Sequence, residues 1–301
     1  MFSSFLPTNV ARLTEPDSIE FASQIQRIDL ATSLLARQIP TSYIRQGNGG
    51  IPIVFLHGFD SSIFEFRRII PIIAAHTEVW AIDLLGFGFT ERFPDCPFSP
   101  TSICTHLAAF WQTIIQQPII LVGVSMGGAA AIEFTLNHPE AVHKLVLIDS
   151  AGFTQPPAMG KFLIQPLGNL ATKFLSSPKV RKSVSEKAYF DRSFVTTDAQ
   201  LCAALHLEMP NWSEALIAFT RSGGYGYLLD RLPEISQETL IVWGKHDRIL
   251  GTKAAQLFEQ NLPTARLQWI DNCGHVPHLE QCQITAESIL DFDRQIKYIK
   301  L

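Results

Sequence analysis

Several short runs of aliphatic and β-branched residues recur along this 301-residue chain, and nearly every position within each run is apolar. Continuous apolar runs are typical of strands buried on both faces, as in a parallel sheet. Segments of helical length separate most of them, which predicts an α/β fold with helices on both faces of the sheet. The predicted strands are 51–56, 78–84, 119–124, 144–149, 239–243 and 266–270, and the predicted helices include 63–75, 101–116, 127–137 and 252–261.

The interval 151–232 breaks this alternation because it contains no convincing strand. Its apolar residues recur at helical spacing at Leu163, Leu167, Leu170 and Phe174. About 80 residues are too many for a plain connection between strands. The expected organisation is a core formed by 1–150 and 233–301, with an all-helical cap, or lid, over 151–232.

The beginning of the chain is compatible with two interpretations. Residues 18–36 fit a helix, whereas 24–30 and 41–46 fit a pair of antiparallel strands. We favour strands near the sheet edge, preceded by a loose or short helical arm.

The sequence Gly123-Val124-Ser125-Met126-Gly127-Gly128 directly follows one predicted strand and opens a predicted helix. A serine at such a turn is held in a strained conformation with its hydroxyl above the sheet, and small neighbours let the backbone fold back closely. The alternative is a glycine-rich turn with a structural role only. The strand–turn–helix context favours Ser125 as a nucleophile, with the N–H of Met126 as an oxyanion donor.

A second loop, His57-Gly58-Phe59, follows the predicted strand 51–56. Glycine at its centre lets this loop pass close to the serine, so the N–H of Phe59 is the expected second oxyanion donor. We interpret His57 as a structural residue that bonds the loop backbone, because a better candidate for the base lies elsewhere.

Two further loops follow the last predicted strands and supply the remaining polar groups. Asp247 lies in Trp243-Gly244-Lys245-His246-Asp247, and His275 follows 28 residues later in Asn272-Cys273-Gly274-His275. The order serine, aspartate, histidine is the one expected at this edge of an α/β sheet, with His275 as base and Asp247 as its orienting acid. Asp149 also ends a strand and competes for the acid role. The structural alternatives are a helix cap for Asp247 and a buried loop position for His275.

Together, the blocks HGF, DLLGFG, GVSMGG, LVLID, IVWGKHD and GH-x-P-H-x-E resemble the α/β-hydrolase superfamily over about 51–150 and 233–295. The resemblance implies a mostly parallel eight-stranded sheet whose second strand is antiparallel, and a helical cap over the site. Serine at position 125 argues against the dehalogenase and epoxide hydrolase members, which carry aspartate there.

Composition restricts the partners and the compartment. The net charge of −4 argues against broad nucleic-acid binding. Five cysteines without a CxxC pair fit neither a disulfide framework nor a usual zinc site, so a reducing, cytoplasmic compartment is expected. The start of the chain has no secretory pattern, and no apolar run has the length of a membrane span. No metal or organic cofactor is expected, and the sequence leaves the oligomeric state open.

Residues 161–192 carry seven basic and two acidic residues, with apolar residues between them. One interpretation is a weak contact with an anionic membrane through this part of the cap. We favour the other, in which a solvated face covers a packed apolar underside.

The sequence thus predicts a serine hydrolase that cleaves an ester, or a related acyl bond, of a hydrophobic small molecule or lipid. Apolar cap residues together with Phe59, Met126, Val276 and Pro277 are expected to line its pocket. The alternatives are a hydrolase of carbon–carbon bonds in ring-fission products and a non-enzymatic ligand receptor on the same fold.

Overall fold

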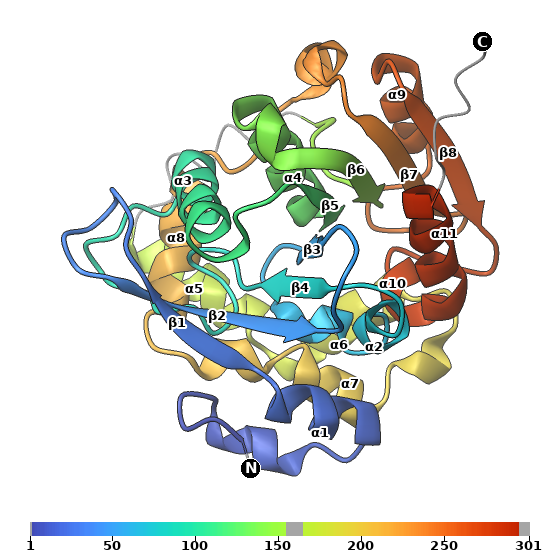
Figure 1. Cartoon of the computed structure of the whole chain (residues 1–301). Helices are drawn as coiled ribbons and strands as arrows, with labels where there is room; N and C mark the ends of the chain where they lie inside the picture. Colours follow the sequence, from blue (N-terminus) through green and yellow to red (C-terminus); the bar gives the residue numbers. More distant parts are fainter. Residues whose placement is uncertain (1, 155–164, 295–301) are drawn as a thin grey trace, which may run out of the picture.

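Eight strands form one sheet in the computed structural model, which describes residues 2–154 and 165–294 (Figure 1). Their order is β1-β2-β4-β3-β5-β6-β7-β8, and β2 runs antiparallel to both of its neighbours while all other neighbours are parallel. The mostly parallel sheet expected from the sequence is therefore confirmed. The strands are β1 (Gln26–Leu30), β2 (Ile39–Gln46), β3 (Ile53–Leu56), β4 (Val79–Ile82), β5 (Ile119–Val124), β6 (Val142–Ile148), β7 (Glu238–Gly244) and β8 (Ala265–Ile270).

Helices cover both faces of the sheet, which explains why its central strands are apolar at every position. Within β3, Val54 and Leu56 belong to one core cluster, while Ile53 and Phe55 belong to the other. The first cluster includes residues of α3 (Pro100–Phe110), α4 (Met126–Asn137) and α9 (Lys253–Asn261). The second includes residues of α1 (Pro16–Ser23), α2 (Ile70–Ala74) and α11 (Cys282–Arg294).

The N-terminal region forms strands at the sheet edge, as favoured above. The 3-10 turn η1 (Thr8–Arg12) and α1 precede β1, and β1 pairs with β2 in antiparallel register, Gln26 opposite Tyr43. The helix over 18–36 is wrong because α1 ends at Ser23.

The predicted helix 63–75 is also wrong, because the segment divides into η2 (Ile63–Phe66) and the separate α2. Pro71 stands in the first turn of α2, where its missing N–H costs nothing, and in the middle of one long helix it would break the hydrogen-bond ladder. Residues 101–116 divide similarly into α3 and a π-helical turn, η3 (Trp111–Ile115).

The described residues between β6 and β7 form four helices: α5 (Gln165–Leu175), α6 (Pro178–Ala188), α7 (Thr197–Cys202) and α8 (Trp212–Arg221). The short turns η6 (Arg192–Phe194) and η7 (Leu205–Glu208) lie between these helices, and η8 (Leu229–Glu234) lies between α8 and β7. The described part of this interval contains no strand. We call the segment from α5 to η8 the helical insertion; Figure 1 shows α5 and α8 at the left of the view and α6 and α7 below β4. Leu163 lies outside the described residues.

Two short elements complete the fold. The turn η4 (Pro139–Ala141) precedes β6, and α10 (Pro277–Glu280) precedes α11. Within residues 2–154 and 165–294, no helix has both the length and the apolar character needed to span a membrane.

Candidate active site

Ser125 occupies the sharp turn between β5 and α4, with φ of 51° and ψ of −118°. Its N–H donates to the carbonyl oxygen of Ile148 at 3.0 Å, which ties the turn to the neighbouring strand. A Cβ at Gly123 would lie 2.3 Å from the Gly127 oxygen, and one at Gly127 would lie 2.1 Å from the Leu56 oxygen. These close approaches explain why the turn needs glycine on both sides of the serine.

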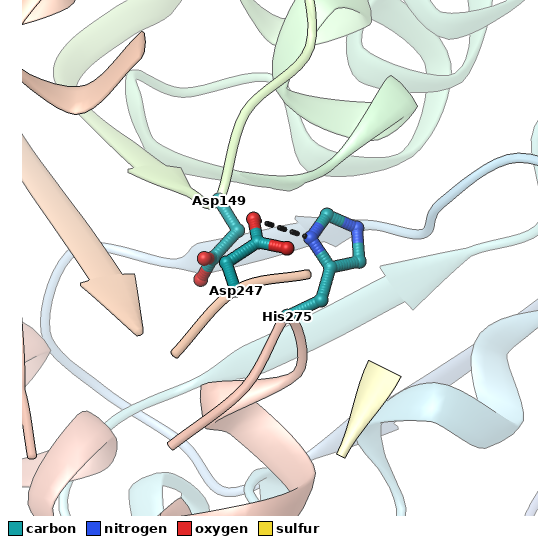
Figure 2. A group of neighbouring side chains, drawn as sticks. All are labelled: Asp149, Asp247 and His275. Atoms are coloured by element: carbon teal, nitrogen blue, oxygen red, sulfur yellow. Dashed lines mark hydrogen bonds and ion pairs between the residues drawn. The ribbon is translucent and has the colours of Figure 1, made fainter. Parts of the chain in front are cut away.

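His275 and Asp247 meet above the end of the sheet (Figure 2). His275 Nδ1 lies 3.0 Å from Asp247 Oδ2, and Asp247 Oδ1 accepts the N–H groups of Ile249 and Leu250 at 2.7 and 3.1 Å. Burial raises the pKa of Asp247, but the hydrogen bond and charge of His275, together with the N–H groups of Ile249 and Leu250, hold this pKa below its usual value. The carboxylate is therefore ionised at neutral pH. It does not cap α9, whose N-cap residue is Thr252.

Asp149, the competing acid, lies beside this pair without bonding His275 in the structure. Its carboxyl accepts the Gly244 N–H at 3.2 Å, and it is completely buried. Burial, and next the charge of Asp247, raise the pKa of Asp149 well above its usual value. One oxygen from each carboxyl and a ring nitrogen of His275 lie within 4.8 Å of one another, and the Asp247–His275 hydrogen bond joins two of these three groups.

Ser125 and His275 line the same cavity, whose volume is about 290 Å³. The structure thus brings the three residues of the predicted serine–histidine–aspartate set to one place. Within the described residues, no hydrogen bond joins Ser125 Oγ to His275. Such contacts often tighten only when substrate is bound.

The loop after β3 passes close to the serine, as its glycine suggested. A Cβ at Gly58 would lie 3.6 Å from that of Ser125, and the Gly58 N–H donates to Glu65 Oε2 at 2.9 Å. The N–H groups of Phe59 and Met126 make no hydrogen bond to any described residue. In addition, Met126 begins α4, where backbone N–H groups have no partner within the helix.

His57 bonds the loop backbone instead of facing the cavity. Its Nδ1 lies 2.8 Å from the Gly58 carbonyl oxygen, and its Nε2 accepts the Leu84 N–H at 3.1 Å. Burial lowers the pKa of His57 to about 3, so the ring is neutral at physiological pH. These contacts match the structural interpretation of His57.

The expected pocket lining differs from the structure at two positions. Among the described residues, the cavity wall includes Phe59 and Val276 but neither Met126 nor Pro277. The Met126 side chain packs instead in the core cluster shared with α3, and Pro277 is buried at the first position of α10.

The cavity wall also contains charged residues that the sequence did not reveal: Asp60, Glu65, Arg67 and Arg181. Asp60, directly after Phe59, receives three donors from the helical insertion. Its Oδ2 accepts Arg181 Nη1 at 2.6 Å, and its Oδ1 lies 2.8 Å from Trp212 Nε1 and 3.2 Å from His206 Nε2. No local pattern predicts this cluster, because Asp60 is more than 100 residues from each of its three partners in the chain.

Glu280 connects the helical insertion to the His275 loop. Its carboxylate accepts the N–H groups of Phe190, Asp191 and Gly274 at 3.1, 2.6 and 2.7 Å. The His275 N–H itself donates to the Ala188 carbonyl at 2.6 Å. The backbone position of His275 thus depends on the insertion as well as on the core.

Comparison with known proteins shows the family. The sequence profile described as "Alpha/beta hydrolase family" matches residues 53–288. The chain belongs to the alpha/beta hydrolase family. This hydrolase is 33% identical over 300 residues to the alpha/beta hydrolase domain-containing protein VTE7 of Arabidopsis thaliana, with 97% of this chain and 90% of that protein covered.

A second relative of this hydrolase is the 2-hydroxy-6-oxo-2,4-heptadienoate hydrolase of Pseudomonas putida, which is 27% identical over 274 residues and covers 88% of this chain and 96% of its own. Among solved structures, an esterase from Exiguobacterium antarcticum superposes with a TM-score of 0.76 at 22% identity, covering 90% of this chain and all of that one. The esterase likeness establishes the fold alone.

Proposed function

We propose that this hydrolase is a serine hydrolase that cleaves carboxylic esters of hydrophobic small molecules or lipids through an acyl-enzyme on Ser125. The observation that carries the proposal is the placement of Ser125, on a strained turn, in the same cavity as His275, whose Nδ1 is held by Asp247.

The reaction follows from the roles of these groups. Ser125 Oγ attacks the ester carbonyl while His275 Nε2 takes the hydroxyl proton, and His275 then returns that proton to the departing alcohol. Water repeats the sequence on the acyl-enzyme and releases the acid. Asp247 holds the histidine tautomer and stabilises the imidazolium. The N–H groups of Phe59 and Met126 donate to the oxyanion, and losing one such donor typically costs about 3 kcal/mol of transition-state stabilisation.

A second candidate is the hydrolysis of a carbon–carbon bond in a ring-fission product. The observation that favours it is the similarity to the Pseudomonas putida hydrolase, whose name specifies a 2-hydroxy-6-oxo-dienoate. The same nucleophile, base and acid serve both reactions, so the candidate site does not separate them.

Paired substrate assays test the proposal. The purified protein is given p-nitrophenyl esters from acetate to laurate and, separately, a 2-hydroxy-6-oxo-dienoate, with Ser125→Ala as the control. We expect ester turnover that depends on Ser125. Turnover of the dienoate with negligible ester cleavage would favour the second candidate, and tight ligand binding without turnover of either would favour a receptor.

A further inference from the structure

Helix α5 exposes a stripe of large apolar side chains. Leu167, Leu170 and Phe174 are 56%, 66% and 64% exposed, and they are the three most exposed large apolar residues in the described chain. Their spacing of three and four residues places them on one side of the helix. A contiguous exposed apolar patch of this kind marks an interaction surface.

The other side of α5 already has its packing partner. A Cβ at Gly168 would lie 2.8 Å from the Ile217 side chain of α8, and Thr172 Oγ1 lies 2.7 Å from Ser213 Oγ. The exposed stripe is therefore additional to the buried face. The packed apolar underside favoured from the sequence is wrong for Leu167, Leu170 and Phe174.

Basic residues outnumber acidic ones in the segment that contains α5 and α6. Residues 165–192 contain six basic and two acidic residues, a net charge of +4 within a chain of −4, so the remainder carries −8. The exposed lysines of α5 and α6 are Lys173, Lys179, Lys182 and Lys187. Within the described residues, the ion pair found for these lysines is that of Lys182 with Glu186, at 3.9 Å. An anionic surface complements this charge, whereas a second copy of the chain, docked face to face, would oppose like charges.

The cavity opens beside the same helices. Helix α6 follows α5 after two residues and contributes Val184, which is 51% exposed and lines the cavity of Ser125. Phe59 and Ile249, which are 47% and 39% exposed, also line it. Apolar side chains are thus accessible at the entrance to the cavity.

We propose that the face formed by α5 and α6 docks on a membrane surface that contains anionic lipids. The stripe inserts among the lipids, and the lysines contact their headgroups. If the proposed function also holds, the ester substrate reaches Ser125 from the membrane surface.

Vesicle sedimentation tests the docking. The full chain is mixed with phosphatidylcholine vesicles, with or without 30% phosphatidylglycerol, at low salt and in 0.5 M NaCl. We expect at least tenfold tighter association when phosphatidylglycerol is present, and loss of this gain at high salt because the Debye length contracts.

Two surface variants separate the apolar contribution from the charged one. The triple variant Leu167→Ser, Leu170→Ser, Phe174→Ser removes the stripe, and the quadruple variant Lys173→Gln, Lys179→Gln, Lys182→Gln, Lys187→Gln removes the charge. Each lysine near an anionic surface contributes roughly fivefold in affinity, so we expect the quadruple variant to lose at least thirtyfold. The matched control Lys253→Gln, Leu257→Ser, Ile284→Ser changes exposed residues of α9 and α11 and is expected to bind like wild type.

Thermal melts and turnover of a water-soluble short ester accompany the assay, and the surface variants are expected to match wild type in both. No association with any vesicle, or equal association of both surface variants and wild type, would overturn the docking. So would a dimer that the triple variant abolishes, because a second copy would then cover the stripe. If Ser125 proves unreactive while vesicle association persists, the docking stands and the proposed function fails.

Discussion

The carboxyl group of Asp149 lies beside that of Asp247, completely buried and without a cation in contact with it among the described residues. Two adjacent buried carboxyl groups repel each other when both are ionised, so ionising both costs a large amount of free energy. His275 favours the ionised form of Asp247, whereas burial and the charge of Asp247 raise the pKa of Asp149 well above its usual value. The structure therefore adds a second carboxyl group, with a raised pKa, beside the predicted aspartate–histidine pair.

Asp149→Asn is expected to retain turnover within threefold at pH 7, because an amide keeps both a donor and an acceptor. It should also raise the melting temperature at pH 7. The raised pKa of Asp149 means that wild type loses stability as pH rises above about 3.8, the unfolded value, and the variant avoids this loss. The measurement is the melting temperature of Asp149→Asn minus that of wild type at several values from pH 4.5 to 8. This difference should grow as pH rises. A constant or reversed difference would show that Asp149 is ionised in the fold.

Asp247→Asn is expected to lower kcat about 10⁴-fold, because the amide favours the wrong tautomer of His275 and does not stabilise the imidazolium. Asp149→Asn is the matched control, since it changes the neighbouring carboxyl in the same way. Saturation kinetics on a short ester measure both. Equal losses in the two variants would contradict the separate roles assigned to these carboxyls.

Arg181→Met is expected to cost about 3 kcal/mol of unfolding free energy, because it leaves the buried Asp60 carboxylate without its cation. Asp60 follows Phe59, so kcat on a short ester should fall as well. Lys182→Met, on the same helix, removes a surface pair and should change stability by less than about 1 kcal/mol. Urea unfolding of the two variants makes the comparison. Similar losses of unfolding free energy in both would refute a stabilising role for the Asp60–Arg181 pair.

Buried neutral histidines are expected to make the fold sensitive to acid. Burial lowers the pKa of His57 to about 3 and that of His106 to about 4. The contribution of each histidine to the free energy of unfolding is complete above the unfolded pKa of about 6.5. It is lost as pH falls, by about 2 kcal/mol for each histidine at pH 5. Urea unfolding at pH 7.5, 6 and 5 measures the slope. His106→Gln should make the unfolding free energy depend less steeply on pH. An unchanged slope would show that His106 is not a source of the acid sensitivity.

The sequence predicted the positions of Ser125, Asp247 and His275 because each lies in the segment that follows a strand, and the carboxyl ends of parallel strands meet at one sheet edge. The regular apolar runs likewise located every strand of the parallel part. The Asp60–Arg181 contact had no such signal, because it joins segments 121 residues apart in the chain. The helical spacing of the stripe on α5 was recognised, but its exposure was not predicted, because helical periodicity shows that residues share a face and not whether that face is covered.

The most direct test of the central claim is labelling with a fluorophosphonate, followed by intact-mass measurement and peptide mapping. The account predicts one covalent adduct, on Ser125, which is absent in Ser125→Ala and forms much more slowly in His275→Ala. An unlabelled protein, or an adduct on another residue with ester turnover preserved in Ser125→Ala, would contradict it.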